Sequence, residues 1–180
     1  MTEAWTIGRV LAWARDDLKG RGSQSPRLDA ELLLAQVLDC DGIKLITDSQ
    51  RPLQAHELAA YRGLHKRRRL GEPVAYSRGF REFYGRPFLV DSRVLVPRPE
   101  TEILVEVGLK RTRHLDLCAR VLDVCTGSGC VAITLAKERP TTRVLASDVS
   151  SEALEVARDN GHRLGGRVGF VHSDLFGGFA

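Results

Sequence analysis

The chain has 180 residues, of which 43% are apolar and 28% charged, and its formal net charge is +4. The apolar share is too high for a disordered chain, and no uncharged apolar stretch approaches the roughly 18–20 residues of a membrane helix. Four cysteines without a Cys-x-x-Cys pair exclude a disulfide scaffold, so we expect a reduced, cytoplasmic protein. The five histidines lack metal-ligand spacing, and we expect no metal.

The first part of the chain has the spacing of helices. Apolar residues between Ile7 and Leu18 recur every three or four positions. Ser25-Pro26 has the pattern of an N-cap followed by proline at the first helical position, and a third helix follows Pro52. We therefore predict a small helical bundle over residues 1–71.

The pattern changes after the bundle. Residues 79–90 alternate and carry aromatic side chains, which predicts a β-hairpin with its turn near Gly85. We assign residues 72–97 to a linker that contains this hairpin. Pro99 is well placed to open the next helix.

From residue 120 onward, short apolar strands alternate with helices. This order is typical of an α/β fold and predicts the first half of a doubly wound parallel sheet within residues 98–180. Such a sheet normally continues beyond its first strand, so we expect a part of a longer protein whose first strand has an unpaired edge. The predicted strands are 120–124, 144–146 and 168–171, and the predicted helices are 131–137 and 152–163.

The strongest local signal is the loop Cys125-Thr126-Gly127-Ser128-Gly129, which follows the first strand. Two glycines at this spacing let the backbone pass close beneath a ligand. Asp148 lies nineteen residues after Gly129, at the end of the second strand, where a carboxylate suits the two hydroxyls of a ribose. The loop and the acid together predict a nucleoside cofactor.

The neighbouring acids favour one cofactor over another. Asp123 precedes the loop and no third glycine follows, which is unfavourable for the pyrophosphate of NAD. S-adenosylmethionine carries a sulfonium and an ammonium group and no phosphate, so an acid beside the loop attracts it. Asp174, after the third strand, could accept a hydrogen bond from the adenine amino group. We therefore predict S-adenosylmethionine, with a nicotinamide oxidoreductase as a weaker alternative.

Four segments together resemble the protein-glutamine N-methyltransferases of the HemK/PrmC type, namely Gly71–Tyr76, Phe83–Gly85, Val94–Glu102 and Asp123–Cys130. The resemblance implies a Rossmann-like class I methyltransferase domain, here partial. It also implies methyl transfer to the glutamine of the Gly-Gly-Gln motif in peptide-chain release factors. The helical domain, residues 1–71, would contact that protein substrate.

The resemblance also implies roles for single residues. The loop would wrap the methionine part of the cofactor, and Asp148 would hold the ribose. Asp174 and Leu175, after the third strand, would border the adenine. In the proline-rich motif, Pro97–Glu102, residues 98–101 would lie close to the same pocket. The implied cofactor-binding residues are Cys125, Thr126, Gly127, Ser128, Gly129, Asp148, Asp174, Leu175, Arg98, Glu100 and Thr101.

Two departures from the family pattern matter. The Asn-Pro-Pro-Tyr signature does not occur in residues 1–180, so we predict no catalytic residue here and no methylation by this segment alone. Cys125 and Cys130 resemble a sister family that methylates a glutamine of a large-subunit ribosomal protein. Glu100-Thr101-Glu102 favours the release-factor group, and the sister family remains the alternative.

Other functions stay open at this point. The basic run His65–Arg69 could bind RNA, although a solvated helix end explains it more simply. A non-enzymatic module that binds protein or RNA is a further alternative. We expect a monomer when the protein is full length, and no membrane partner.

Overall fold

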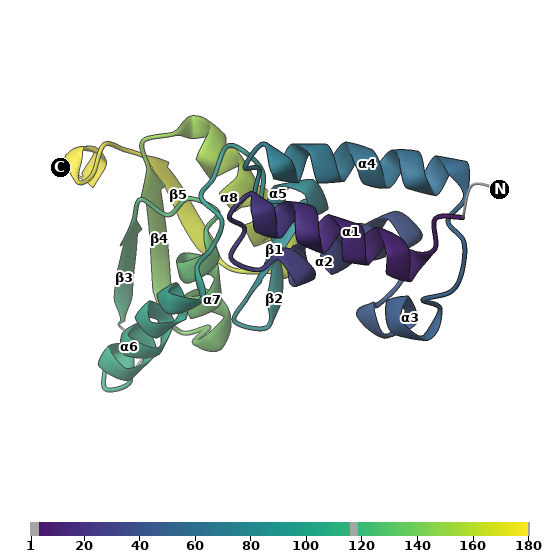
Figure 1. The fold of residues 1–180 in the computed structure, drawn as a ribbon. Coiled ribbons are helices and arrows are strands. Elements are labelled where there is room, and N and C mark those ends of the chain that lie inside the picture. Colours follow the sequence, from purple (N-terminus) through teal and green to yellow (C-terminus); the bar gives the residue numbers. More distant parts are fainter. Residues whose placement is uncertain (1–3, 116–118, 180) are drawn as a thin grey trace. The chain divides into compact units, whose positions relative to one another are not determined.

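The computed structural model describes residues 4–115 and 119–179. Cys118, one of the four cysteines, lies outside these described residues. The chain divides into two compact units, residues 1–78 and 79–180, which are coloured from purple to teal and from teal to yellow in Figure 1. Each unit has its own hydrophobic core, and each is described by itself below.

The first unit is helical, as predicted. The three predicted helices are present as α1, α2 and α4, and two short helices were not predicted. One of these, α3, begins at an N-cap, Asp41, whose carboxylate accepts the N–H of Lys44. The helices are α1 (Ile7–Gly20), α2 (Pro26–Leu38), α3 (Gly42–Thr47), α4 (Ala55–Arg69) and α5 (Val74–Arg78).

The helices of the first unit pack around a hydrophobic core of their own. The predicted stripe of α1 packs against Leu33, Leu34 and Tyr61, all of them fully buried. Asp29 of α2 is also buried, and it accepts hydrogen bonds from the hydroxyls of two serines and from the guanidinium of Arg68. A buried carboxylate is tolerated here because hydrogen-bond donors surround it.

The second unit has the predicted mixture of strands and helices. The elements are β1 (Phe80–Phe83), β2 (Arg86–Leu89), η1 (Pro99–Thr101), α6 (Glu102–Thr112), β3 (Arg120–Val124), α7 (Cys130–Glu138), β4 (Arg143–Asp148), α8 (Ser151–Leu164), β5 (Val168–His172) and η3 (Gly177–Phe179). The strands β3, β4 and β5 form a parallel sheet in that order, which confirms the predicted fold class. Within the described residues β3 pairs only with β4, so one of its edges is unpaired.

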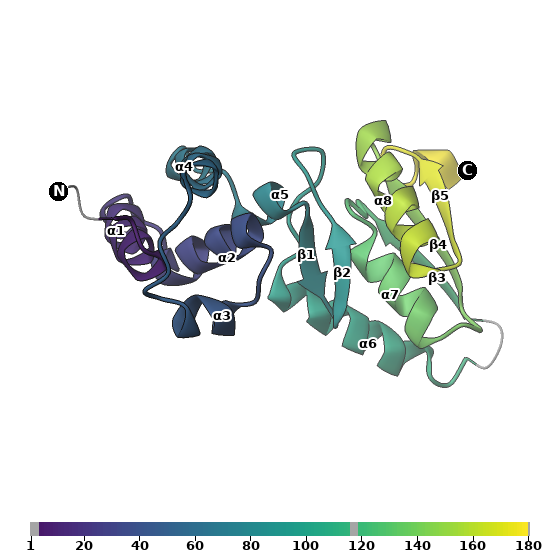
Figure 2. The same cartoon turned by 90° about the vertical axis from the view of Figure 1, so that its right-hand side faces the viewer.

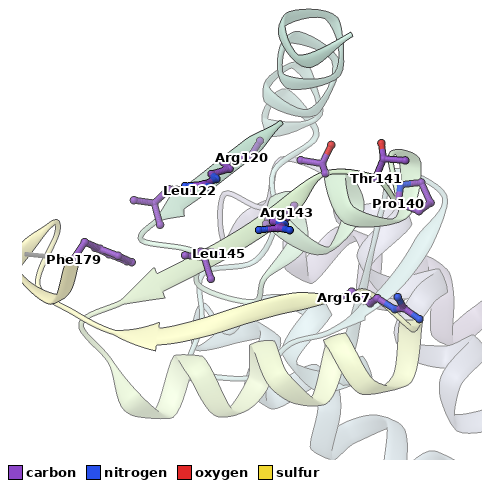
Figure 3. A pocket seen from close by; sticks show the side chains of 11 residues that line it. Arg120, Leu122, Pro140, Thr141, Arg143, Leu145, Arg167 and Phe179 are labelled. Carbon is purple, nitrogen blue, oxygen red and sulfur yellow. The ribbon is translucent and has the colours of Figure 1, made fainter. Parts of the chain in front are cut away.

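The sheet is covered on one face. Helices α6, α7 and α8 lie on the same side of it in Figure 2. Val144 and Ala146 face these helices and are buried, whereas the alternate residues Leu122 and Leu145 are exposed by 36% and 44%. The open face holds a hollow of about 900 Å³, into which Leu122, Leu145 and Phe179 project (Figure 3).

The predicted hairpin is present, with Tyr84 and Gly85 at its turn. Phe83 and Phe88 are buried, and their rings meet edge to face with 6.0 Å between centroids. Both belong to the core that also contains residues of α6, α7 and β4. The hairpin is therefore part of the packed α/β unit. The predicted boundaries at residues 71 and 97 stay predictions.

No helix in the described part of the chain combines the length and the apolar character needed to cross a bilayer.

Candidate functional site

The glycine loop joins the end of β3 to the start of α7. Cys125, Gly127 and Gly129 have positive φ angles of 60°, 54° and 78°. The φ of Gly129 favours glycine, and a Cβ there would also crowd the end of the Ile133 side chain at 2.8 Å and Ala157 at 3.2 Å. A Cβ at Gly127 would meet nothing within 4 Å, which leaves the backbone open to a ligand at this point.

Asp148 holds the loop from the end of β4. One carboxylate oxygen accepts the N–H of Gly127 at 2.9 Å and the other accepts the N–H of Ser150 at 3.0 Å. The N–H of Thr126 also donates to the carbonyl of Ser147. A carboxylate offers about four acceptor positions, so Asp148 retains capacity for the hydroxyls of a ribose.

Asp123 lies near the end of β3, just before the loop. Its Oδ2 accepts the hydroxyl of Thr126 at 2.6 Å. Burial raises the pKa of the Asp123 carboxyl, and the negative charge of Asp148 raises it further, while the hydroxyl of Thr126 and the N–H of Ala132 act in the opposite direction. A cationic ligand beside the loop would favour the ionised carboxylate.

The segment after β5 reaches the same edge of the sheet. The N–H of Ser173 donates to the carbonyl of Asp148 at 3.0 Å, which fixes the ends of β4 and β5 together. Asp174 and Leu175 follow directly, both exposed, and Leu175 has a φ of 47°. The structure thus brings the loop and Asp148 together and places these two residues after the adjacent strand end. Their contact with adenine stays a prediction.

The proline-rich motif has a structural function that was not predicted. Glu102 accepts the backbone N–H of Tyr84 at 2.8 Å and so anchors the hairpin turn to α6. Arg98 and Glu100 are exposed and lie 3.5 Å apart as an ion pair. A position for Arg98, Glu100 and Thr101 near the cofactor stays a prediction.

The role of Asn160 in α8 was not predicted from the sequence. Its side chain is fully buried, accepts the N–H of Leu89 at 2.7 Å, and donates to the carbonyls of Leu89 and Ser128 at 3.0 Å each. A signal was available, because helical spacing places Asn160 on the buried face with Ala153, Val156 and Ala157. An amide on such a face must find partners among backbone groups or other polar side chains.

The cysteines near the loop differ in exposure. Cys125 is exposed, whereas Cys130 is buried and burial raises the pKa of its thiol to about 11. Such a thiol is protonated at neutral pH and is a poor nucleophile. Among the described residues, no three His, Cys, Asp or Glu side chains are placed to hold a metal ion.

The basic run at the end of α4 is engaged within the helical unit. Arg67 pairs with Glu72 at 2.6 Å, Arg68 with Asp29 at 2.8 Å, and Arg69 with Asp17 at 3.1 Å. These ion pairs favour a structural explanation of the run. Direct nucleic-acid binding stays an untested alternative.

Comparisons with known proteins agree with this division of the chain. Residues 9–79 match the PrmC N-terminal domain family, and residues 121–177 match a methyltransferase domain family. The predicted resemblance and the predicted Rossmann-like fold class are confirmed by these matches.

Three curated relatives are each named release factor glutamine methyltransferase. The protein from Rhodopirellula baltica is 44% identical over 97% of this chain, that from Koribacter versatilis 48% over 94%, and that from Geobacter sulfurreducens 42% over 97%. This chain spans 60% of the length of each of these relatives.

Proposed function

We propose that this chain, which joins a PrmC N-terminal domain to a methyltransferase domain, binds S-adenosylmethionine at the loop 125–129. The whole protein would transfer the methyl group to the side-chain amide nitrogen of the Gly-Gly-Gln glutamine in peptide-chain release factors. One observation carries the proposal: relatives that are 42–48% identical to this chain over 94–97% of its length are named for that reaction.

The geometry of the loop fits this cofactor. The open backbone at Gly127 allows close approach, and Asp148 has acceptor capacity left for ribose hydroxyls. Asp123 adds a carboxyl group beside the loop, which favours a ligand with positive charge. When bound, S-adenosylmethionine supplies a methyl group that its sulfonium activates for transfer. The side chains named here would hold and orient it.

The acceptor half of the reaction needs groups of another kind. An amide nitrogen is a poor nucleophile because its lone pair is delocalised, so it must be oriented by acceptors for its two hydrogens. The Asn-Pro-Pro-Tyr signature that would supply them does not occur in these 180 residues. We therefore assign no catalytic residue within residues 1–180. We assign cofactor binding to the α/β unit and contact with the release factor to the helical unit.

Calorimetry tests the cofactor part of the proposal. We expect each chain to bind one S-adenosylmethionine. Asp148→Asn should raise the Kd about tenfold or more, because one charged acceptor is lost. Asp159→Asn is the matched control, since it removes the same charge from an exposed position of α8. Preferential binding of NADH would contradict the proposal. Absence of binding by any nucleoside would favour a non-enzymatic module.

A methyl-transfer assay tests the substrate. A protein extended to the length of the relatives should methylate a release factor and should fail when the Gly-Gly-Gln glutamine is changed to alanine. The 180-residue chain alone should give no transfer. Turnover on a large-subunit ribosomal protein, with none on the release factor, would instead favour the sister family. The predicted cytoplasmic location and monomeric state are parts of the same proposal.

A further inference from the structure

We propose that Asn160 is a positioning residue for the cofactor: its buried amide ties the glycine loop to the β-hairpin and holds the loop in its binding shape. The inference deepens the proposed function and rests on it. It is drawn from three hydrogen bonds that link segments far apart in sequence, at Leu89, Ser128 and Asn160.

The side-chain amide of Asn160 pairs with the backbone of Leu89 through two hydrogen bonds. Leu89, the last residue of β2, both donates its N–H to Oδ1 at 2.7 Å and accepts a hydrogen from Nδ2 at 3.0 Å. This paired exchange satisfies both backbone groups of Leu89, as a neighbouring strand would. Helix α8 contacts β2 within the same unit (Figure 2). The hairpin is thereby tied to α8 through both backbone groups of Leu89.

The second hydrogen of the amide reaches the loop. Nδ2 also donates to the carbonyl of Ser128 at 3.0 Å, and this contact is buried. Ser128 lies between Gly127 and Gly129, both in the left-handed conformation, so its carbonyl direction depends on two flexible residues. Asp148 holds the N–H of Gly127 from β4, and Asn160 holds the carbonyl of Ser128 from α8. The loop is restrained at two adjacent residues by two different elements.

Loss of the amide should therefore loosen the loop. The N–H and carbonyl of Leu89 and the carbonyl of Ser128 would lose their partner, which is costly for buried groups. An open loop binds no cofactor, so the apparent affinity falls in proportion to the fraction of molecules in the closed form. A tenfold fall in that fraction gives a tenfold rise in the apparent Kd.

The decisive variant is Asn160→Asp, which preserves the volume of the side chain. Its carboxylate can still accept the N–H of Leu89 but cannot donate to either carbonyl. We expect folded Asn160→Asp and Asn160→Ala to bind S-adenosylmethionine about tenfold or more weakly in calorimetry. Asp159→Ala, at the neighbouring exposed position, should bind like the unchanged chain. Circular dichroism ensures that affinities are compared only between folded proteins.

Amide hydrogen exchange gives a measurement that needs no cofactor. In the unchanged chain the Leu89 amide should exchange as slowly as the core amides of α8. The variants should speed exchange in the loop, at Gly129 and its neighbours, while the amides of β4 stay protected. Fast exchange of Leu89 in the unchanged chain would overturn the inference without any variant.

The two proposals fail in different ways. Folded Asn160→Asp that binds S-adenosylmethionine like the unchanged chain overturns the positioning role and leaves the proposed function intact. If the unchanged chain does not bind S-adenosylmethionine, the proposed function fails. The exchange rates of the loop then decide alone whether Asn160 fixes its shape.

Discussion

The helical unit and the α/β unit use hydrogen-bonded polar side chains for different purposes. In the helical unit, Asp29 and Glu57 are buried and pair with arginines of the same unit, so these contacts support its packing. In the α/β unit, Asp148 and Asn160 bind backbone groups of one loop. The first arrangement stabilises a fold, whereas the second fixes the shape of a candidate binding site.

The largest expected effect concerns two cysteines of the α/β unit: Cys125, at the start of the glycine loop, and Cys130, directly after it. At pH 8 a thiol with a pKa of about 11 is ionised in only about one molecule in a thousand, and Cys130 is buried as well. Exposed Cys125 should therefore react with iodoacetamide about a hundredfold faster or more. Tandem mass spectrometry separates the two sites, which share a tryptic peptide.

Bound cofactor sharpens this measurement. S-adenosylmethionine should slow alkylation of Cys125 and leave the reaction of Cys40 in the helical unit unchanged, because only Cys125 belongs to the loop. Equal rates at Cys125 and Cys130 would show that the loop opens freely. The glycine loop would then not have the fixed shape that distinguishes its polar contacts from those of the helical unit.

The next effect concerns stability, in the helical unit. Arg68→Ala leaves the buried carboxylate of Asp29 without its cation, although two serine hydroxyls still donate to it. We expect the free energy of unfolding to fall by about 2–3 kcal/mol, as for a lost hydrogen bond to a charged group. Both tryptophans of the chain, Trp5 and Trp13, lie in this unit, so their fluorescence during urea denaturation follows its unfolding.

Arg67→Ala is the matched control for this change. Arg67 is the adjacent residue, and its ion pair with Glu72 is more exposed than that of Arg68, with 49% of the Arg67 side chain accessible against 21% of the Arg68 side chain. Exposed pairs contribute about 0–1 kcal/mol, so this variant should be nearly neutral. Equal losses from both variants would mean that burial of Asp29 has no special weight in this unit.

These contrasts also mark what the sequence could predict. Periodicity and glycines correctly placed α1, α7 and α8 and the loop between β3 and α7, because these signals are local. Helix α3 was missed because its six residues span less than two helical turns. The links of Asn160 to Leu89 and of Glu102 to Tyr84 join segments 71 and 18 residues apart. No local pattern encodes such partners, since they depend on how the elements pack.

A smaller effect is expected from His65, which is buried in the helical unit against Asp17. Burial lowers the pKa of His65, and the charge of Arg69 lowers it further, although the hydrogen bond and charge of Asp17 raise it. The unfolded chain therefore binds the proton more readily than the folded chain. The unit should lose stability as the pH falls below the ordinary histidine value of 6.5, towards and through the lowered pKa.

The measurement is urea denaturation between pH 7.5 and 5, followed by tryptophan fluorescence. His65→Gln should flatten this dependence, whereas His56→Gln, at an exposed position of α4, should preserve it. A stability that rises as the pH falls through this range would contradict the assigned direction of the pKa. Among the described residues, no histidine of the α/β unit is buried.

The smallest effect is expected at the open face of the sheet in the α/β unit, where Leu122 and Leu145 are exposed. Leu145 and Leu122 are adjacent in the β3–β4 register and expose apolar surface beside the edge of β3, which is unpaired among the described residues. This arrangement favours self-association. Leu145→Lys should reduce concentration-dependent association in sedimentation experiments and leave the unfolding of the helical unit unchanged. Leu28 of α2 is 53% exposed, against 44% for Leu145, and Leu28→Lys should leave association as it was. If both variants reduce association alike, general surface hydrophobicity explains the association. The open face of the sheet then promotes association no more than the surface of the helical unit does.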